Sequence, residues 1–334
     1  MTPKERVLNR LEGKPVDKIP NLNIIMTFAA KYINIPYKKY VTDYRYLVEG
    51  NVKCCEKFGI DMVSAISDPY RETYDLGANI IFPEDDVPIC TDFLLKKYSD
   101  IKKLHIKNPL TSKRMLDRIK AIELYKKEVG NNYPILGWIE GPISEAANLR
   151  GVNNIMTDFI DAPDFVNELF ELCSAQAIEF GIEQIRAGAD FIGVGDAAAS
   201  LIGPYYYKSF VLPFEIKIFN TLHQAGGKVK LHICGNITPI LHLISQSGAD
   251  IVDVDWMVDF EKAVNTLSDT CAACGNFNPV ILLNGSTETV EEAVKKCIKA
   301  SKNNTMIAAG CEVPKETPYE NMLKVDEVLR GALI

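Results

Sequence analysis

Residues 190–234 read DFIGVGDAAASLIGPYYYKSFVLPFEIKIFNTLHQAGGKVKLHIC. A short apolar run opens this stretch at residues 190–195, and another closes it at residues 228–234. Runs of this length that end in turn or polar residues predict buried β-strands, and helical stretches lie between most such runs in this chain. Strands that alternate with helices favour a parallel sheet with the helices outside it.

The same pattern recurs along the whole chain. Eight runs predict strands, at residues 20–26, 60–66, 134–140, 190–195, 228–234, 250–255, 270–274 and 305–311. Residues 162–187 and 289–302 carry apolar side chains at helical spacing, which predicts amphipathic helices. Eight strands that alternate with helices are typical of a (β/α)₈ TIM barrel. We therefore expect an α/β protein with a single barrel domain over residues 1–334.

One connection is too long for a simple crossover between neighbouring strands. Residues 67–133 join the second and third predicted strands and contain two turn-rich pieces, DPYRE and FPEDDVP. A charged helical stretch follows at residues 110–129. We expect an insertion between strands 2 and 3 that covers one side of the barrel mouth.

Composition restricts the partners and the compartment. The chain has a formal net charge of -7, which disfavours a nucleic-acid partner because such partners require a basic surface. No apolar run approaches the roughly 20 residues needed to cross a bilayer, so we expect no membrane association. Residues 1–14 predict a helix capped by Thr2 rather than a secretion signal, and we expect a cytoplasmic protein.

Polar side chains gather where the predicted strands end, which is where TIM barrels carry their catalytic groups. The residues at these ends are Glu140, Asp196, His232 with Cys234, Asp255, Asn276 and Cys311. We take the three carboxylates among them as catalytic candidates. Asp196 and Asp255 could supply a further metal ligand or accept a proton, but they could equally cap the helices that follow.

The histidine and the two cysteines of this set are candidate metal ligands. His232 and Cys234 are two residues apart at a strand end, so their side chains point to the same side. Cys311 ends the last predicted strand and can reach across the mouth. Two thiolates and an imidazole suit Zn²⁺, and three protein ligands leave one tetrahedral position open for a substrate. Spacing alone leaves open the alternative that these are ordinary packed side chains.

A second cysteine pair, Cys271 and Cys274, has the Cys-x-x-Cys spacing of a metal or redox motif. Their odd spacing on a predicted strand directs the two thiols to opposite faces of the sheet, so they cannot chelate one ion together. We expect both to pack in the core.

The chain resembles the uroporphyrinogen decarboxylase superfamily, and within it the methylcobamide:coenzyme M methyltransferase branch, over essentially its whole length. The resemblance rests on six ordered segments: MTPKERVLNRLEGKPVDKIP, GPISEAANLRG, GDAAASLIGPYYYKSFVLPF, KLHICGNITPIL, GNFNPVILLNGSTETV and AAGCEVPKETPYENM. The branch carries a zinc motif of the form His-x-Cys-(many)-Cys. His232, Cys234 and Cys311 occupy its three positions in this sequence.

The resemblance implies an enzyme that moves a methyl group. Zn²⁺ would be the metal, a methylated corrinoid (cobamide) on a partner corrinoid protein the donor, and a thiol such as coenzyme M the acceptor. One alternative acceptor is tetrahydrofolate, as in bacterial demethylase systems. Two further alternatives are a uroporphyrinogen decarboxylase and a non-catalytic corrinoid-binding protein. Decarboxylases of the superfamily hold their substrate's carboxylates with an arginine segment near the first strand, and residues 20–26 contain no arginine.

Overall fold

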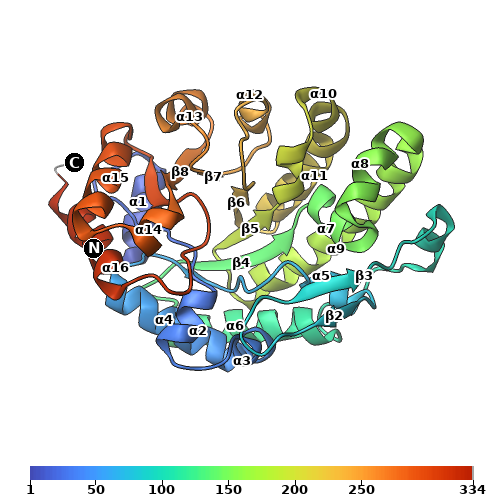
Figure 1. The fold of residues 1–334 in the computed structure, drawn as a ribbon, viewed down its shortest axis with the longest axis horizontal. Helices are drawn as coiled ribbons and strands as arrows, with labels where there is room; N and C mark the ends of the chain where they lie inside the picture. The colour runs from blue at the N-terminus through green and yellow to red at the C-terminus, as the bar shows by residue number, and fades with distance from the viewer. Residues whose placement is uncertain (333–334) are drawn as a thin grey trace.

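The computed structural model describes residues 1–332, so the last two residues of the predicted domain lie outside the described residues. Seven parallel strands form one sheet in the order β1-β4-β5-β6-β7-β8-β9. Their bounds are β1 Val63–Ser64, β4 Ile135–Glu140, β5 Phe191–Gly195, β6 Lys228–His232, β7 Ile251–Val254, β8 Ala272–Phe277 and β9 Met306–Ala309. Figure 1 shows helices around the outside of this curved sheet. The predicted α/β barrel architecture is therefore confirmed.

The first predicted strand, residues 20–26, was wrong as a regular strand. Asn21 makes a single parallel bridge with Ile307, and its carbonyl accepts a 2.8 Å hydrogen bond from the Asp61 backbone. Beyond that point the Asn23 side-chain oxygen, rather than a backbone carbonyl, accepts from the Ala309 backbone N–H at 2.8 Å. The segment thus lies between β9 and β1, at the eighth position of the barrel, without a continuous backbone ladder.

The seventh predicted strand ended too early. Residues 270–274 were expected, but β8 continues to Phe277 and includes Asn276. The Asn276 amide donates to the Val258 backbone carbonyl at 2.7 Å, so this polar residue is accommodated inside the strand. The predicted strand thus stopped at Cys274, three residues before the observed end.

Helices form the outer layer. They are α1 Pro3–Leu11, α2 Thr27–Tyr32, α3 Tyr37–Thr42, α4 Tyr44–Phe58, α5 Arg71–Asp75, α6 Lys113–Glu128, α7 Pro142–Arg150, α8 Val152–Asp161, α9 Pro163–Ala187, α10 Pro204–Tyr206, α11 Leu212–Gln224, α12 Leu241–Ile244, α13 Phe260–Leu267, α14 Pro279–Asn284, α15 Thr287–Lys299 and α16 Tyr319–Gly331. The helices expected at residues 110–129, 162–187 and 289–302 correspond to α6, α9 and α15. Among residues 1–332 no helix combines the length and apolar character needed to span a membrane.

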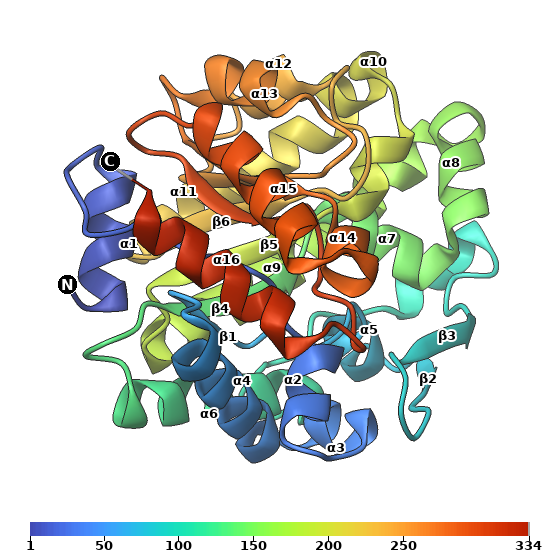
Figure 2. The same cartoon turned by 60° about the vertical axis from the view of Figure 1, so that its left-hand side comes forward.

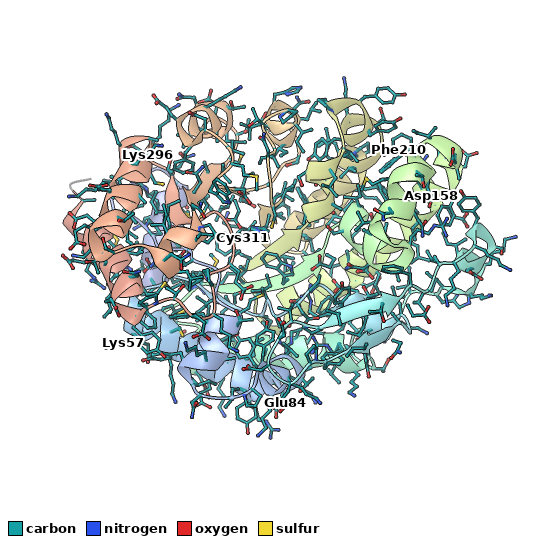
Figure 3. All side chains as sticks on the ribbon, viewed as in Figure 1. Lys57, Glu84, Asp158, Phe210, Lys296 and Cys311 are labelled. Atoms are coloured by element: carbon teal, nitrogen blue, oxygen red, sulfur yellow. The ribbon has the colours of Figure 1, made fainter. Side chains whose placement is uncertain are left out.

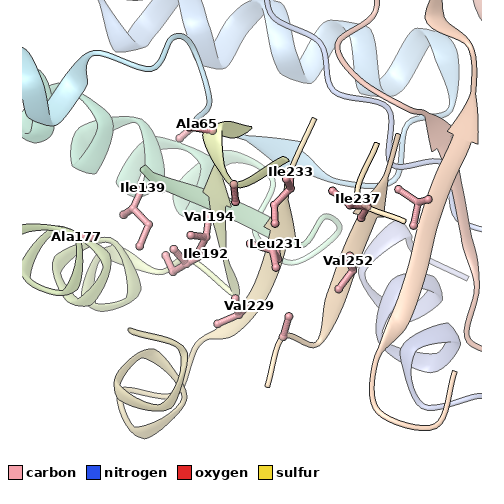
Figure 4. Close-up of a cluster of buried hydrophobic side chains, with 14 of the residues drawn as sticks. Ala65, Ile139, Ala177, Ile192, Val194, Val229, Leu231, Ile233, Ile237 and Val252 are labelled. Carbon is pink, nitrogen blue, oxygen red and sulfur yellow. The ribbon is translucent and has the colours of Figure 1, made fainter. Parts of the chain in front are cut away.

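Two apolar layers lie on the two faces of the sheet. The larger fills the space between the strands and the helices; Figure 4 shows part of it, with Ile192, Val194, Val229 and Leu231. The smaller includes Val7, Leu136, Phe191 and Ile251 and fills the barrel interior. Alternate residues of β4, β5, β7, β8 and β9 supply the two layers, as parallel strands covered on both faces require, whereas β6 contributes only to the larger layer.

Helix α1 covers the amino end of the barrel. Thr2 caps this helix as predicted, and the side chains of Thr2 and Glu5 each accept from the other's backbone N–H in a capping box. The Lys4 ammonium reaches Asp190 before β5, at 2.7 Å, and Arg6 reaches Asp61 before β1, at 2.5 Å. Because this end is sealed by ion pairs and by Val7, access to the interior is from the carboxyl ends of the strands.

The insertion begins with α5 and an antiparallel hairpin of β2 (Asn79–Ile81) and β3 (Ile89–Asp92), followed by a 3₁₀ turn at Tyr98–Lys103. In both Figure 1 and Figure 2 the hairpin lies outside the barrel, beside α5. Asp85, between its strands, pairs with Lys315 at 2.6 Å, and the Leu95 backbone N–H donates to the Leu149 carbonyl at the end of α7. Lys315 follows the carboxyl end of β9, and Arg71 of α5 pairs with Glu140 at the carboxyl end of β4. The insertion therefore borders the barrel mouth.

Candidate metal centre

His232, Cys234 and Cys311 converge at the carboxyl end of the sheet. The His232 Nε2 atom lies 3.0 Å from the Cys234 sulfur and 4.0 Å from the Cys311 sulfur, and the two sulfurs are 3.5 Å apart. Within residues 1–332 these three form the group whose ligand atoms are close enough to hold one metal ion. Figure 3 labels Cys311 inside the ring of helices.

The local backbone explains how the three side chains meet. His232 is the last residue of β6, and Cys311 follows β9 by two residues. Gly235, after Cys234, has a φ of +93°, a conformation that glycine adopts without strain. Gly310 allows the loop after β9 to approach the loop after β7, because a Cβ there would lie 2.4 Å from the Trp256 nitrogen.

The donor set fits zinc. In a tetrahedral site with Zn–S bonds of about 2.3 Å and Zn–N bonds of about 2.0 Å, ligand atoms lie roughly 3.5 to 3.8 Å apart. The observed separations of 3.0, 3.5 and 4.0 Å bracket that range. One histidine and two cysteines leave a fourth coordination position to a substrate, which is the pattern of catalytic rather than structural zinc sites.

The two thiols are not equivalent. The hydrogen bond from the Cys234 thiol, together with His232, lowers the pKa of Cys311 to about 4. The same contact and burial raise the pKa of Cys234. Because a zinc ion would bind both sulfurs as thiolates, its binding displaces the proton held between them.

Two residues that the sequence analysis missed support His232. The Asp253 carboxylate on β7 lies 2.9 Å from Nδ1 of His232 and also pairs with the Lys230 ammonium on β6. Burial works against ionisation of Asp253, but Lys230 and then His232 outweigh it and lower its pKa to about 2. A lysine two residues before the histidine, on the same face of an apolar strand, was the available signal.

Glu140 is the last residue of β4, at the barrel mouth, as expected. The side chains that donate hydrogen bonds to it are buried. Its Oε1 accepts from Arg71 at 2.6 Å and from the Trp138 indole N–H at 3.3 Å. Burial raises the pKa of Glu140 to about 8, although the Arg71 charge opposes the shift. The Trp138 ring centroid lies 6.0 Å from that of His232, so Trp138 links this carboxyl group to the candidate metal ligands.

Asp196 is fully buried beyond the end of β5 and bonds protein groups instead of the metal ligands. Its Oδ1 accepts from the Ser144 backbone N–H at 2.8 Å. Its Oδ2 and Oε1 of Glu215 have no hydrogen-bond partner among residues 1–332, while the Tyr207 hydroxyl donates to Glu215. Burial raises the pKa of both carboxyl groups, that of Glu215 to about 7. Two such groups side by side are stable only if they retain a proton.

Asp255 follows β7, and its carboxylate accepts hydrogen bonds from backbone N–H groups in two loops. Its Oδ2 accepts from the Gly235 N–H at 2.9 Å, and its Oδ1 accepts from the Met257 N–H at 3.1 Å. The first contact fixes the residue directly after Cys234. Neither residue caps the helix that follows it, because Asp196 makes no side-chain bond to the 3₁₀ turn at Ala197–Leu201 and α13 is capped by Asp259. Both carboxylates instead accept from other backbone N–H groups, and neither belongs to the group of three close ligand atoms.

The second cysteine pair lies where alternation on a strand would place it. Cys271 belongs to the layer between sheet and helices, whereas Cys274 belongs to the barrel interior. Both are nearly fully buried. The two thiols thus lie on opposite faces of the sheet.

The chain is similar in sequence and in structure to known proteins. A methylcobamide:CoM methyltransferase of Methanosarcina mazei is 28% identical over 99% of this chain and 98% of its own length. A uroporphyrinogen decarboxylase of Carboxydothermus hydrogenoformans is 26% identical over 84% of this chain and 81% of its own. A solved methyltransferase structure from M. mazei superposes with a TM-score of 0.90 at 23% identity, covering 98% of both chains.

The family model described as "Uroporphyrinogen decarboxylase (URO-D)" matches residues 2–331. Because this match spans nearly the entire sequence, the chain belongs to the uroporphyrinogen decarboxylase family.

Proposed function

We propose that the chain, acting as one domain over residues 1–334, is a zinc-dependent methyltransferase. Its donor is the methyl-Co(III) corrinoid of a partner corrinoid protein, and its acceptor is a thiol such as coenzyme M. The observation that carries the proposal is the convergence of His232, Cys234 and Cys311 at the open end of the barrel. Relatives named methylcobamide:CoM methyltransferase that align over nearly the full chain support it.

The zinc ion, the two cysteines and the histidine have different roles in the proposed reaction. A zinc ion held by them would supply a Lewis acid that lowers the pKa of a thiol acceptor. Two cysteine thiolates moderate that acidity, so the acceptor sulfur retains nucleophilicity. His232, held from its other nitrogen by Asp253, keeps Nε2 directed at the two sulfurs.

The transfer balances without a further reactant. The acceptor sulfur forms a bond to the methyl carbon while the carbon–cobalt bond breaks, and both electrons of that bond remain on cobalt, giving Co(I). The acceptor's proton has to leave. We propose Glu140 as the group that exchanges it, because a carboxyl group with a pKa near 8 at the barrel mouth can take up or release a proton near neutral pH.

The other two candidate carboxylates receive positioning roles in this proposal. Asp255 orients the loop that carries Cys234, through Gly235. Asp196 fixes the start of α7 through the Ser144 N–H. Neither role requires contact with the substrate.

Decarboxylation of a porphyrinogen is less well supported, although relatives with that name align with the chain. Such a substrate requires free cationic groups to pair with its carboxylates. Arg71, near the mouth, is fully buried and pairs with Glu140, and Arg114 pairs with Asp68. These guanidinium groups already have counter-ions from the protein.

The test is to measure the zinc content of the purified protein and then to assay methyl transfer from free methylcobalamin. We expect about one zinc per chain and zinc-dependent methylation of coenzyme M. Methylation of tetrahydrofolate in place of coenzyme M would select the alternative acceptor. A zinc-free protein that methylates neither acceptor would overturn the proposal.

A further inference from the structure

A buried charge pair lies directly behind the candidate metal ligand His232. Lys230 and His232 project from the same face of β6, and Asp253 is the residue of β7 that pairs with His232 in the sheet register. Lys230, Asp253 and His232 are only 1%, 6% and 7% exposed. A lysine is almost never this buried unless a specific partner accompanies it. The position therefore requires an explanation beyond packing.

One oxygen atom of Asp253 connects the other two residues. Its Oδ2 accepts from the Lys230 ammonium and lies 2.9 Å from Nδ1 of His232. A neutral imidazole that donates from Nδ1 has its lone pair on Nε2. Nε2 itself lies 3.0 Å from the Cys234 sulfur.

Stability alone does not account for the pair, because desolvating two charges offsets most of their attraction inside a protein. Charge balance gives a functional reason. Two thiolates neutralise a divalent ion, and Lys230 neutralises Asp253, so the complete centre carries no net charge in the barrel interior.

We propose that Lys230 and Asp253 are positioning residues that hold the His232 proton on Nδ1 and thereby keep Nε2 available to the metal. This inference rests on the proposed metal-dependent function. Asp253 acts on His232 directly, and Lys230 acts through Asp253.

The proposal predicts different effects for two variants of Asp253. In Asp253→Ala no acceptor remains for the Nδ1 proton of His232. We expect its zinc affinity to fall about 10- to 100-fold, the usual effect of removing an outer partner of a metal-binding histidine. In Asp253→Asn the amide oxygen can take the place of Oδ2 and accept from both Lys230 and Nδ1. We expect its zinc affinity to stay within about threefold of the wild type.

Zinc affinity is measured by competition with a chromophoric chelator, and ligation is followed by the visible absorption of the Co²⁺-substituted protein. The matched control is Asp61→Ala at the amino end of the barrel, since Asp61 is buried between Arg6 at 2.5 Å and Lys18 at 3.2 Å. It should lower the unfolding midpoint but leave zinc affinity unchanged.

Each outcome decides the proposal. Wild-type affinity in Asp253→Ala overturns it, as does a folded Asp253→Asn that binds zinc as weakly as Asp253→Ala. If Asp253→Ala unfolds, the double variant Asp253→Ala/Lys230→Met, which leaves neither buried charge unpaired, takes its place. A loss of zinc affinity of about 10- to 100-fold in that double variant supports the proposal, and wild-type affinity overturns it. If the wild type itself binds no zinc, the proposed function fails instead, so the two failures are distinguishable.

Discussion

Arg71 donates a 2.6 Å hydrogen bond to Oε1 of Glu140, and both side chains are buried where β4 reaches the barrel mouth. The pairing connects the insertion to the candidate site, because Arg71 begins α5 and Glu140 ends β4. It also separates Glu140 from the other two strand-end carboxylates, whose oxygens accept from backbone N–H groups.

Replacing Glu140 with Gln should lower the rate of methyl transfer while leaving zinc content unchanged. The amide still accepts from Arg71 but cannot exchange a proton, and loss of a general acid–base group typically costs about 100-fold or more in rate. Steady-state assays with methylcobalamin and coenzyme M measure the effect. Glu145→Gln is the control, since Glu145 is equally buried but accepts from Thr73 inside the fold. An unchanged rate in Glu140→Gln would remove Glu140 from the mechanism.

Replacing Cys234 or Cys311 with Ala should reduce bound zinc from about one per chain to nearly none, because two protein ligands cannot hold a catalytic zinc tightly. The fold should persist, since a large barrel does not depend on one metal ion as a small zinc domain does. Elemental analysis and circular dichroism measure the two effects. Cys271→Ala, in the layer between sheet and helices, should retain its zinc. Stoichiometric zinc in Cys234→Ala would contradict the assignment.

The sequence predicted most of the strands and the meeting of His232 with Cys234, because both depend on local patterns. Apolar runs mark strands, and His-x-Cys at a strand end places two ligands on one side. The partner of His232 could not be predicted in this way, since Asp253 reaches it only through the register between β6 and β7. That register depends on packing of the whole barrel rather than on any local pattern.

The sequence likewise could not predict where the carboxylates of Asp196 and Asp255 point. Position at a strand end placed Asp196 and Asp255 at the mouth, but whether such a side chain turns to the cavity or to a nearby backbone N–H depends on the loops around it. The Ser144 N–H at the start of α7 and the Gly235 N–H after Cys234 attract them. Residues 20–26 show the same limit for the fold prediction. The apolar run predicted a strand, but the segment makes one bridge, at Asn21, and the Asn23 side chain then accepts from the Ala309 N–H in place of a backbone carbonyl.

The paired carboxyl groups of Asp196 and Glu215 should make the metal-free protein less stable as pH rises. Burial raises the pKa of Glu215 to about 7, so between about pH 4.5 and pH 7 the folded chain binds a proton that the unfolded chain has released. The contribution of that proton to the free energy of unfolding is fully present at low pH. It falls by about 3 kcal/mol as pH rises through this window.

Urea unfolding at several pH values measures this dependence, and Glu215→Gln should flatten it because its amide can donate to Asp196 without titrating. Other buried carboxyl groups, including Glu140 and Glu312, titrate in the same range, so the difference between wild type and variant isolates the pair. An identical slope in Glu215→Gln would show that the pair does not hold the proton.

Binding of coenzyme M to the zinc-loaded protein should release close to one proton near pH 7. A free thiol with a pKa of about 8.5 is mostly protonated at that pH, whereas a metal binds the thiolate, so the proton has to leave on binding. Calorimetric titration in buffers of different ionisation enthalpy counts the proton, and X-ray absorption should gain one sulfur neighbour at zinc. Cys311→Ala, lacking a ligand, should show neither change. If coenzyme M binds with no proton release and no added sulfur while tetrahydrofolate is methylated from methylcobalamin, the thiol acceptor is wrong. His232, Cys234 and Cys311 would then remain the expected ligands, and the acceptor atom would be a nitrogen.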